Sequence, residues 1–273
     1  ALGVYITFRV LDFADMTVEG SFPLGAAICV YFLIRDHHPL LALLAAGLLG
    51  GVAGIVTGLL HTKLRIPSLL AGILSMIALY SVNLRIMGKA NVSLLGKETA
   101  FTYMETLGLD YAQSVFIVGL LATVVIGTLI YWFFGTEIGA AIRATGFNPQ
   151  MIRAQGIDTN VMLLLGLFLS NALTAMAGAF IGMNNGFFDV GMGVGTIVIG
   201  LASVIIGEVL FGTRSFKNSL VSVILGSIVY RFVIAIVLQM GMPPNDLKLF
   251  TSVLVVIALA LPMMRDKVQR RKV

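Results

Sequence analysis

Long, unbroken runs of apolar residues dominate this chain. The run VFIVGLLATVVIGTLIYWFF, from Val115 to Phe134, is typical. A helix needs about 20 such residues to cross the hydrocarbon of a bilayer. A membrane barrel strand would instead alternate apolar and polar residues over roughly ten positions. Because a backbone in lipid must satisfy its hydrogen bonds internally, these runs predict an all-α, polytopic transmembrane helical bundle.

The apolar runs predict a bundle of about eight or nine helices. The run 194–212 is rich in glycine, and it is compatible with a re-entrant segment as well as with a full crossing. The first run is short and begins at Ala1, so we expect a preceding piece to complete its helix. The runs are 1–11, 17–34, 40–60, 67–88, 112–134, 161–182, 194–212, 215–239 and 249–264.

The composition supports a membrane protein and excludes a soluble one. Hydrophobic residues make up 58% of the 273 residues, charged residues only 11%, and the mean hydropathy is +1.00. A soluble domain has about 25% charged residues. We therefore treat 1–273 as a single transmembrane domain in a lipid bilayer. Its net charge of +5 reflects basic loops and predicts no nucleic-acid partner. One cysteine and three histidines without ligand spacing predict no metal site.

The basic residues set the orientation, because cytoplasmic loops of membrane proteins are rich in Lys and Arg. Eleven of the eighteen fall on the side of loop 135–160 and the C-terminus, four fall on the opposite side, and three lie within spans. The first side is therefore predicted to be cytoplasmic, with the N-terminus outside. The eleven are Lys63, Arg65, Arg143, Arg153, Arg214, Lys217, Arg265, Lys267, Arg270, Arg271 and Lys272, and the four are Arg35, Lys89, Lys97 and Lys248.

The cytoplasmic loop at about 135–160 predicts two short helices. The first is expected from Glu137 to Ala144, with Gly146 at its end. The second is expected to begin after Asn148, a good N-cap, because proline follows at the first helical position. A helix of about two turns is unstable alone in water. It therefore needs support from the membrane domain or from a partner groove, although an ordinary interhelical loop is an open alternative.

This loop resembles the coupling loop of bacterial ABC importer permeases that serve branched-chain amino acids and ribose-type sugars. The family pattern resembles T-x-x-G-x-A-x-R-A-x-G-x-N-x-x-x-A-x-x-x-G-I. Ile152 or Arg153 stands near the position where the family often has alanine, with Ala154 close by. The matching residues are Thr136, Gly139, Ala141, Arg143, Ala144, Gly146, Asn148, Gly156 and Ile157.

Two further stretches are similar to the same family, so the resemblance covers most of the chain. One is VGMGVGTIVIGLASVIIGEVLFG, from Val190 to Gly212. The other is GVYITFRVLDFADMTVEGSFPLGAA, which is most similar to a subgroup whose proposed cargo includes tryptophan or tyrosine. Its matching residues are Asp12, Asp15, Gly20, Gly25 and Ala26.

The resemblance implies the permease subunit of an importer in the bacterial cytoplasmic (inner) membrane, with its C-terminus in the cytoplasm. The implied partners are ABC ATPase subunits, an extracytoplasmic solute-binding protein and a second permease copy in a homodimer. The chain lacks a GxxxxGK[ST] P-loop, so it is expected to be neither an enzyme nor the holder of a cofactor. ATP and Mg would bind the ATPase and drive alternating access for a small solute, an amino acid. The implied coupling residues are Asn148, Pro149, Gln150, Met151, Ile152, Arg153, Ala154, Gln155 and Gly156.

Polar residues inside apolar runs are candidates for the solute path, because ionisable groups in lipid are costly. Arg231 lies too deep in its run to reach the interface easily, and a guanidinium pairs well with a carboxylate. Asn83 and Asn171 are weaker candidates that more often join helices. A possible gate or ion-pair cluster at the junction of the first two runs comprises Arg9, Asp12, Asp15 and Glu19.

Other functions stay open at this stage. A secondary transporter driven by an ion gradient would place carboxylates or histidines at midplane, whereas the few acids here are expected near span ends. A channel subunit is a second alternative, although nothing resembles a carbonyl filter. A structural or assembly membrane subunit is a third. Co-purification with an ATPase would distinguish the importer from these.

Overall fold

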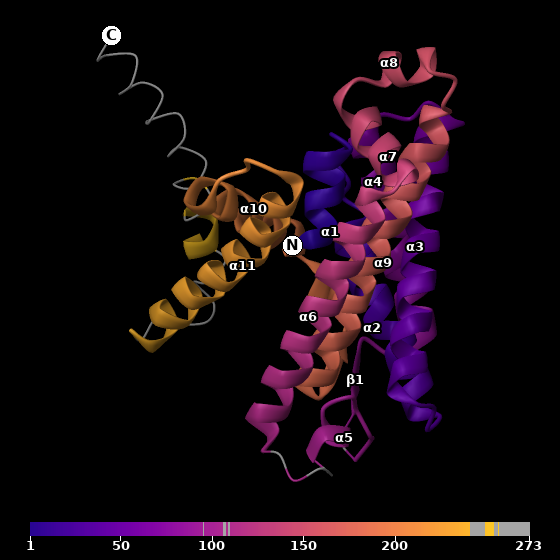
Figure 1. Ribbon diagram of the computed structural model, residues 1–273. Helices are drawn as coiled ribbons and strands as arrows, with labels where there is room; N and C mark the ends of the chain where they lie inside the picture. The colour runs from indigo at the N-terminus through magenta and orange to yellow at the C-terminus, as the bar shows by residue number, and fades with distance from the viewer. Residues whose placement is uncertain (95, 106–107, 109, 241–248, 254–255, 257–273) are drawn as a thin grey trace. The chain divides into compact units, whose positions relative to one another are not determined.

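The computed structural model describes residues 1–94, 96–105, 108, 110–240, 249–253 and 256 (Figure 1). The chain forms two compact units. The larger unit comprises residues 6–196, and the smaller unit comprises residues 1–5 together with the chain from 197 onward.

Long helices build the larger unit, and short elements connect them at both ends. In Figure 1, α8 and β1 lie at opposite ends of these helices. The long helices are α2 (Val18–Ile34), α3 (Pro39–Thr62), α4 (Ser68–Met87), α6 (Tyr111–Gly135) and α9 (Thr159–Asn185). The short elements are η1 (Ile6–Val10, a π-helix), β1 (Asn91–Ser93), α5 (Thr102–Glu105), α7 (Glu137–Phe147), α8 (Pro149–Ala154), β2 (Phe187–Asp189) and η2 (Val190–Gly193, a 3₁₀ helix).

Small residues let α3 approach α9 at backbone distance, as is common in membrane helices. A side chain at Gly54 would overlap the Leu167 carbonyl, and one at Gly58 would meet Leu164. Gly47 and Gly51 face Met176 and Phe168 of α9 in the same way. The regular spacing of these four glycines predicts a buried central helix. Their face of α3 is buried against α9, whereas the face with Leu44, Leu48 and Val52 is exposed.

A two-stranded antiparallel ribbon ties the loop after α4 to the end of α9. Asn91 pairs with Asp189, and Ser93 pairs with Phe187. Lys97 forms a 2.7 Å ion pair with Asp36 in the turn between α2 and α3, and it also donates to the Ile34 carbonyl. The loop is therefore fastened to two helix connections.

The smaller unit contains α1 (Leu2–Tyr5), α10 (Thr196–Phe211) and α11 (Phe216–Gln239). Glycine again allows close packing, because a side chain at Gly207 would overlap the Ser222 carbonyl and one at Gly226 would overlap the Ser203 carbonyl. Asn218 fastens the turn between the two long helices by donating to the Gly212 carbonyl at 3.0 Å. The two helices therefore form a tightly packed hairpin.

The predicted all-α polytopic bundle is confirmed. Six helical segments of the described chain are long and apolar enough to cross a membrane, and α2 is a shorter apolar helix. The run 194–212 corresponds to α10, which has 16 residues and reaches 22 together with η2. The predicted run 249–264 lies largely outside the described residues.

One predicted helix end is wrong. Gly146 does not terminate α7, which continues to Phe147. The reason for glycine at this position is packing, because a side chain there would overlap the Val10 carbonyl of η1.

Candidate functional site

A buried polar network joins α2, α3, α4 and α9. Asp15 lies just before α2, is 2% exposed, and accepts two hydrogen bonds. Its Oδ1 accepts the Thr17 N–H at 2.9 Å, and its Oδ2 accepts Asn171 Nδ2–H at 2.8 Å. Asn171 in turn accepts the Ser21 hydroxyl at 2.8 Å. Both carboxyl oxygens and the amide of Asn171 are thus satisfied, as buried polar groups require.

A chain of hydroxyl groups continues this network. Thr17 Oγ1 and Thr57 Oγ1 lie 2.7 Å apart, and Thr57 Oγ1 is 2.7 Å from Ser75 Oγ. All three residues are buried. Polar contacts of this kind link helices in lipid where apolar contacts give no specificity.

Asp15 lies beside the middle of α9. Asn171, its partner, is the thirteenth of the 27 residues of α9. The expectation that acids lie near the ends of spans stays a prediction, because Asp15 precedes its own helix, α2. Its burial is possible because each oxygen has a hydrogen-bond donor, which offsets part of the cost of burial.

Asp15→Asn should lower the thermal unfolding midpoint of the detergent-solubilised chain. Asparagine keeps one acceptor oxygen, so either Thr17 N–H or Asn171 Nδ2–H loses its partner, at a cost of about 1–3 kcal/mol. The matched control is Asp12→Asn, at an exposed position with φ of 51°, which asparagine tolerates. Equal midpoints for the two variants would contradict a stabilising role for the network.

The other members of the predicted gate cluster lie in different surroundings. Arg9 and Asp12 are exposed. Glu19 is partly buried, and its Oε1 accepts the Gly195 backbone N–H at 3.0 Å. Asp15 and Glu19 therefore have different hydrogen-bond partners. A gating role for the four residues stays a prediction.

The two candidate asparagines are fully buried and join helices. Asn83 Nδ2 donates to the Gly20 carbonyl of α2 at 3.1 Å, and its Oδ1 has no partner among the described residues. Asn171 belongs to the Asp15 network. These contacts explain both residues as packing groups, and their role in a solute path stays a prediction.

The loop between α6 and α9 folds into two short helices with their own caps. Thr136 Oγ1 accepts the Gly139 N–H at the start of α7, and Asn148 Oδ1 accepts the Met151 N–H at 3.1 Å at the start of α8. Gly156 follows α8 with φ of 83°, which glycine adopts readily. The predicted Asn148 cap and Pro149 start are confirmed.

One side of α8 is held by the protein and the other is uncovered. Ile152 is 3% exposed, whereas Met151 is 47% exposed. Pro149, Gln150, Arg153, Ala154, Gln155 and Gly156 are also exposed. Arg153 Nε donates to Thr159 Oγ1 at 2.8 Å, which ties α8 to α9. A short helix held in this way presents a preformed surface to a partner.

The sequence reading missed Phe147, which lies between α7 and α8. It is 95% exposed, more than any other large apolar residue in the described part of the chain. Aromatic residues in such positions are common anchors of protein interfaces. The sequence does contain a signal for Phe147, since an aromatic residue stands directly before the Asn-Pro helix start in a predicted cytoplasmic loop.

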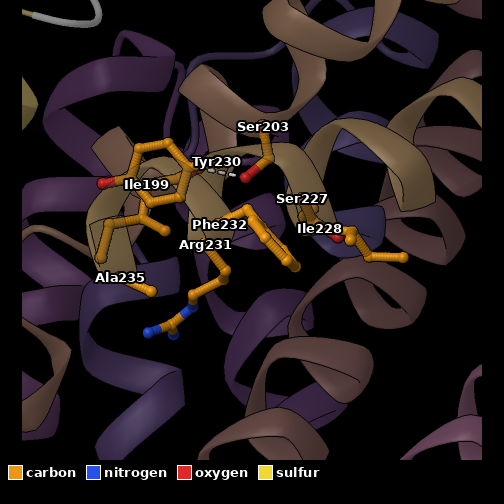
Figure 2. A pocket seen from close by; sticks show the side chains of 9 residues that line it. Ile199, Ser203, Ser227, Ile228, Tyr230, Arg231, Phe232 and Ala235 are labelled. Carbon is orange, nitrogen blue, oxygen red and sulfur yellow. Dashed lines mark hydrogen bonds between the residues drawn. The ribbon is translucent and has the colours of Figure 1, made fainter. Parts of the chain in front are cut away.

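Arg231 lines a cavity of about 510 Å³ in the smaller unit (Figure 2). It is the sixteenth of the 24 residues of α11, and its side chain is exposed within this chain. Ser203 of α10 and Ser227 of α11 also line the cavity. Ala1 lines the cavity too, and among the described residues no carboxylate forms an ion pair with Arg231.

Known proteins are similar to this chain over nearly its whole length. The family described as the permease component of branched-chain amino acid transport systems matches residues 1–260. A tyrosine transport system permease protein of Clostridioides difficile is 41% identical over 95% of this chain and 85% of its own length. An uncharacterised protein of Rickettsia prowazekii is 32% identical over 95% of this chain and 91% of its own length.

More distant relatives are import permeases for another solute. An autoinducer 2 import system permease protein of Salmonella paratyphi B is 27% identical over 71% of this chain and 55% of its own length. No solved structure matches the chain. The family match and the relatives over 95% of the chain agree with the apolar helices and with the loop motif that ends at Gly156-Ile157. The chain is therefore a multi-pass membrane protein that belongs to the family of permease components of branched-chain amino acid transport systems.

Proposed function

We propose that this chain forms the translocation path of an ATP-driven importer for an amino acid, with an aromatic amino acid as the first candidate. The observation that supports it best is the surface of Phe147 and α8, since a preformed, uncovered helix on a predicted cytoplasmic loop suits an ATPase partner. The relative named for tyrosine transport supports the aromatic cargo.

In this proposal, ATP binding and hydrolysis occur on a separate ATPase. Movement of that ATPase shifts α8, and α8 transmits the shift to α9 through Arg153 and Thr159. Two permease copies, related as a homodimer, enclose the path, and a solute-binding protein delivers the solute from outside. The membrane is the bacterial inner membrane, and the C-terminus lies in the cytoplasm with loop 135–160.

Reconstitution tests this proposal. The chain is co-expressed with a candidate ABC ATPase and placed in proteoliposomes with ATP inside and a candidate solute-binding protein outside. We expect uptake of radiolabelled L-tyrosine that requires ATP and the solute-binding protein, and a panel of amino acids and ribose defines the cargo. Uptake without ATP under a proton or sodium gradient would contradict the proposal.

One observation favours the ion-coupled alternative, which is the buried carboxyl of Asp15 beside Asn171, at the middle of α9. Ion-coupled carriers use carboxylates at such depth. Both oxygens of Asp15 already accept hydrogen bonds from the protein, however, so we rank this function second. The gradient-driven arm of the reconstitution measures it directly.

A further inference from the structure

We propose that the cavity beside Arg231 is a solute subsite, in which the guanidinium binds the carboxylate of an amino acid and serine oxygens accept a hydrogen bond from the same solute. This inference rests on the proposed function, because it names the part of the path that recognises the solute. The cavity, the charge of Arg231 and the serine acceptor oxygens each support one part of this inference.

The position of Arg231 requires a polar neighbour. At a rise of 1.5 Å per residue, it lies about 22 Å from the Phe216 end of α11 and about 12 Å from the Gln239 end. A charged group at this depth is costly in lipid, so it must face protein or a water-filled path. The side chain is nevertheless exposed on this chain. The face of α11 with Arg231 is therefore not a lipid-facing surface.

The cavity has the size and composition of a small-molecule site. Its volume of about 510 Å³ falls within the ~300–1,000 Å³ typical of ligand pockets. Ile199, Ile228 and Phe232 provide apolar walls, which suit an aromatic or aliphatic side chain. Arg231 provides the positive charge, and guanidinium–carboxylate pairs are frequently bidentate.

The two serines offer acceptors and not donors. Ser203 Oγ donates to the Ile199 carbonyl at 2.8 Å, and Ser227 Oγ donates to the Ile224 carbonyl at 2.7 Å. With each proton directed at the helix backbone, the oxygen lone pairs remain for an O–H or N–H group. In the view of Figure 2, Ser203 lies at the upper side of the displayed side chains and the Arg231 guanidinium lies at their lower side. A solute with a carboxylate at one point and a donor at another therefore fits this arrangement.

Binding and uptake by the assembled transporter test the subsite. We expect L-tyrosine uptake to be inhibited by amino acids and by the amine-free acid 3-(4-hydroxyphenyl)propionate, and not by tyramine, which lacks the carboxylate. Arg231→Gln should weaken L-tyrosine binding by tenfold or more, and Arg231→Lys should weaken it less, since lysine keeps the charge without the bidentate fork. The matched control is Arg85→Gln, near the Met87 end of α4, which should leave uptake unchanged.

Ser227→Ala identifies the donor on the solute. A contact with the phenol predicts loss of the preference for L-tyrosine over L-phenylalanine, whereas a contact with the ammonium predicts equal weakening for both. Unchanged binding of both amino acids in Ser203→Ala and Ser227→Ala would overturn the serine part of the proposal.

Two other results would overturn the inference as a whole. One is wild-type uptake by Arg231→Gln. The other is loss of uptake together with dissociation of the dimer in native mass spectrometry, which would make Arg231 a contact between copies. A wild-type transporter that shows no ATP-dependent uptake of any amino acid would instead overturn the proposed function, so the two failures are distinguishable.

Discussion

Replacing Gly54 by valine should prevent the larger unit from packing. The new Cβ would overlap the Leu167 carbonyl of α9 and lie 2.9 Å from Asn171 Nδ2. Inserting a side chain into a close-packed site costs about 1–3 kcal/mol, and the cost rises where backbone blocks it. We expect a strongly lowered thermal midpoint and little monodisperse protein by size-exclusion chromatography.

Gly119→Val is the matched control for this change. Gly119 also lies within a long helix, α6, but apart from the adjacent backbone of α6 no described atom lies within 4 Å of the position its Cβ would take. Both substitutions place the same β-branched residue in a helix interior, so the helix-propensity cost cancels. A Gly54→Val protein as stable as Gly119→Val would show that α3 and α9 do not need to approach so closely.

Phe147→Ala should have the second largest effect, and on a different property. The side chain is 95% exposed, so its removal should leave the fold of the chain intact. In the proposed ATPase interface, an aromatic anchor is expected to contribute about 2 kcal/mol, so its loss corresponds to roughly thirtyfold weaker binding. Co-purified ATPase and ATP-driven uptake should fall together.

Phe116→Ala controls for the loss of an exposed aromatic side chain. Phe116 is 69% exposed on α6, far from the loop that contains Phe147. We expect ATPase binding to stay at the wild-type level in this variant. If Phe147→Ala retains both ATPase binding and uptake, Phe147 does not belong to the surface that binds the ATPase.

The sequence predicts those parts of the fold that depend on local pattern. Apolar runs locate the spans, and the Asn148-Pro149 pair locates the start of α8, because both signals are complete within a few residues. Gly146 shows the limit of such reasoning. A glycine at the end of a helix and a glycine under a crossing backbone look alike until the Val10 carbonyl is placed beside it.

The polar network was not predictable, because its members are far apart in sequence. Asp15 and Asn171 are separated by 156 positions, and Thr17 and Thr57 by 40. Asp15 also stands among other charged residues near the chain start, which suggests one cluster. Only the folded chain shows that Asp15 is buried with Asn171 whereas Asp12 is exposed.

The helix α6 has a consequence for the way the protein responds to its membrane. Only Ser114, Ile130 and Phe134 of its 25 residues are buried in the described part of the chain. Such a helix is about 37 Å long, whereas bilayer hydrocarbon is about 30 Å thick. With so few fully buried residues, α6 can match a thinner bilayer by tilting. Hydrophobic mismatch then exerts a force on Gly135 and on α7, which begins two residues later. Bilayer thickness is thereby connected to the loop 135–160 through a single helix.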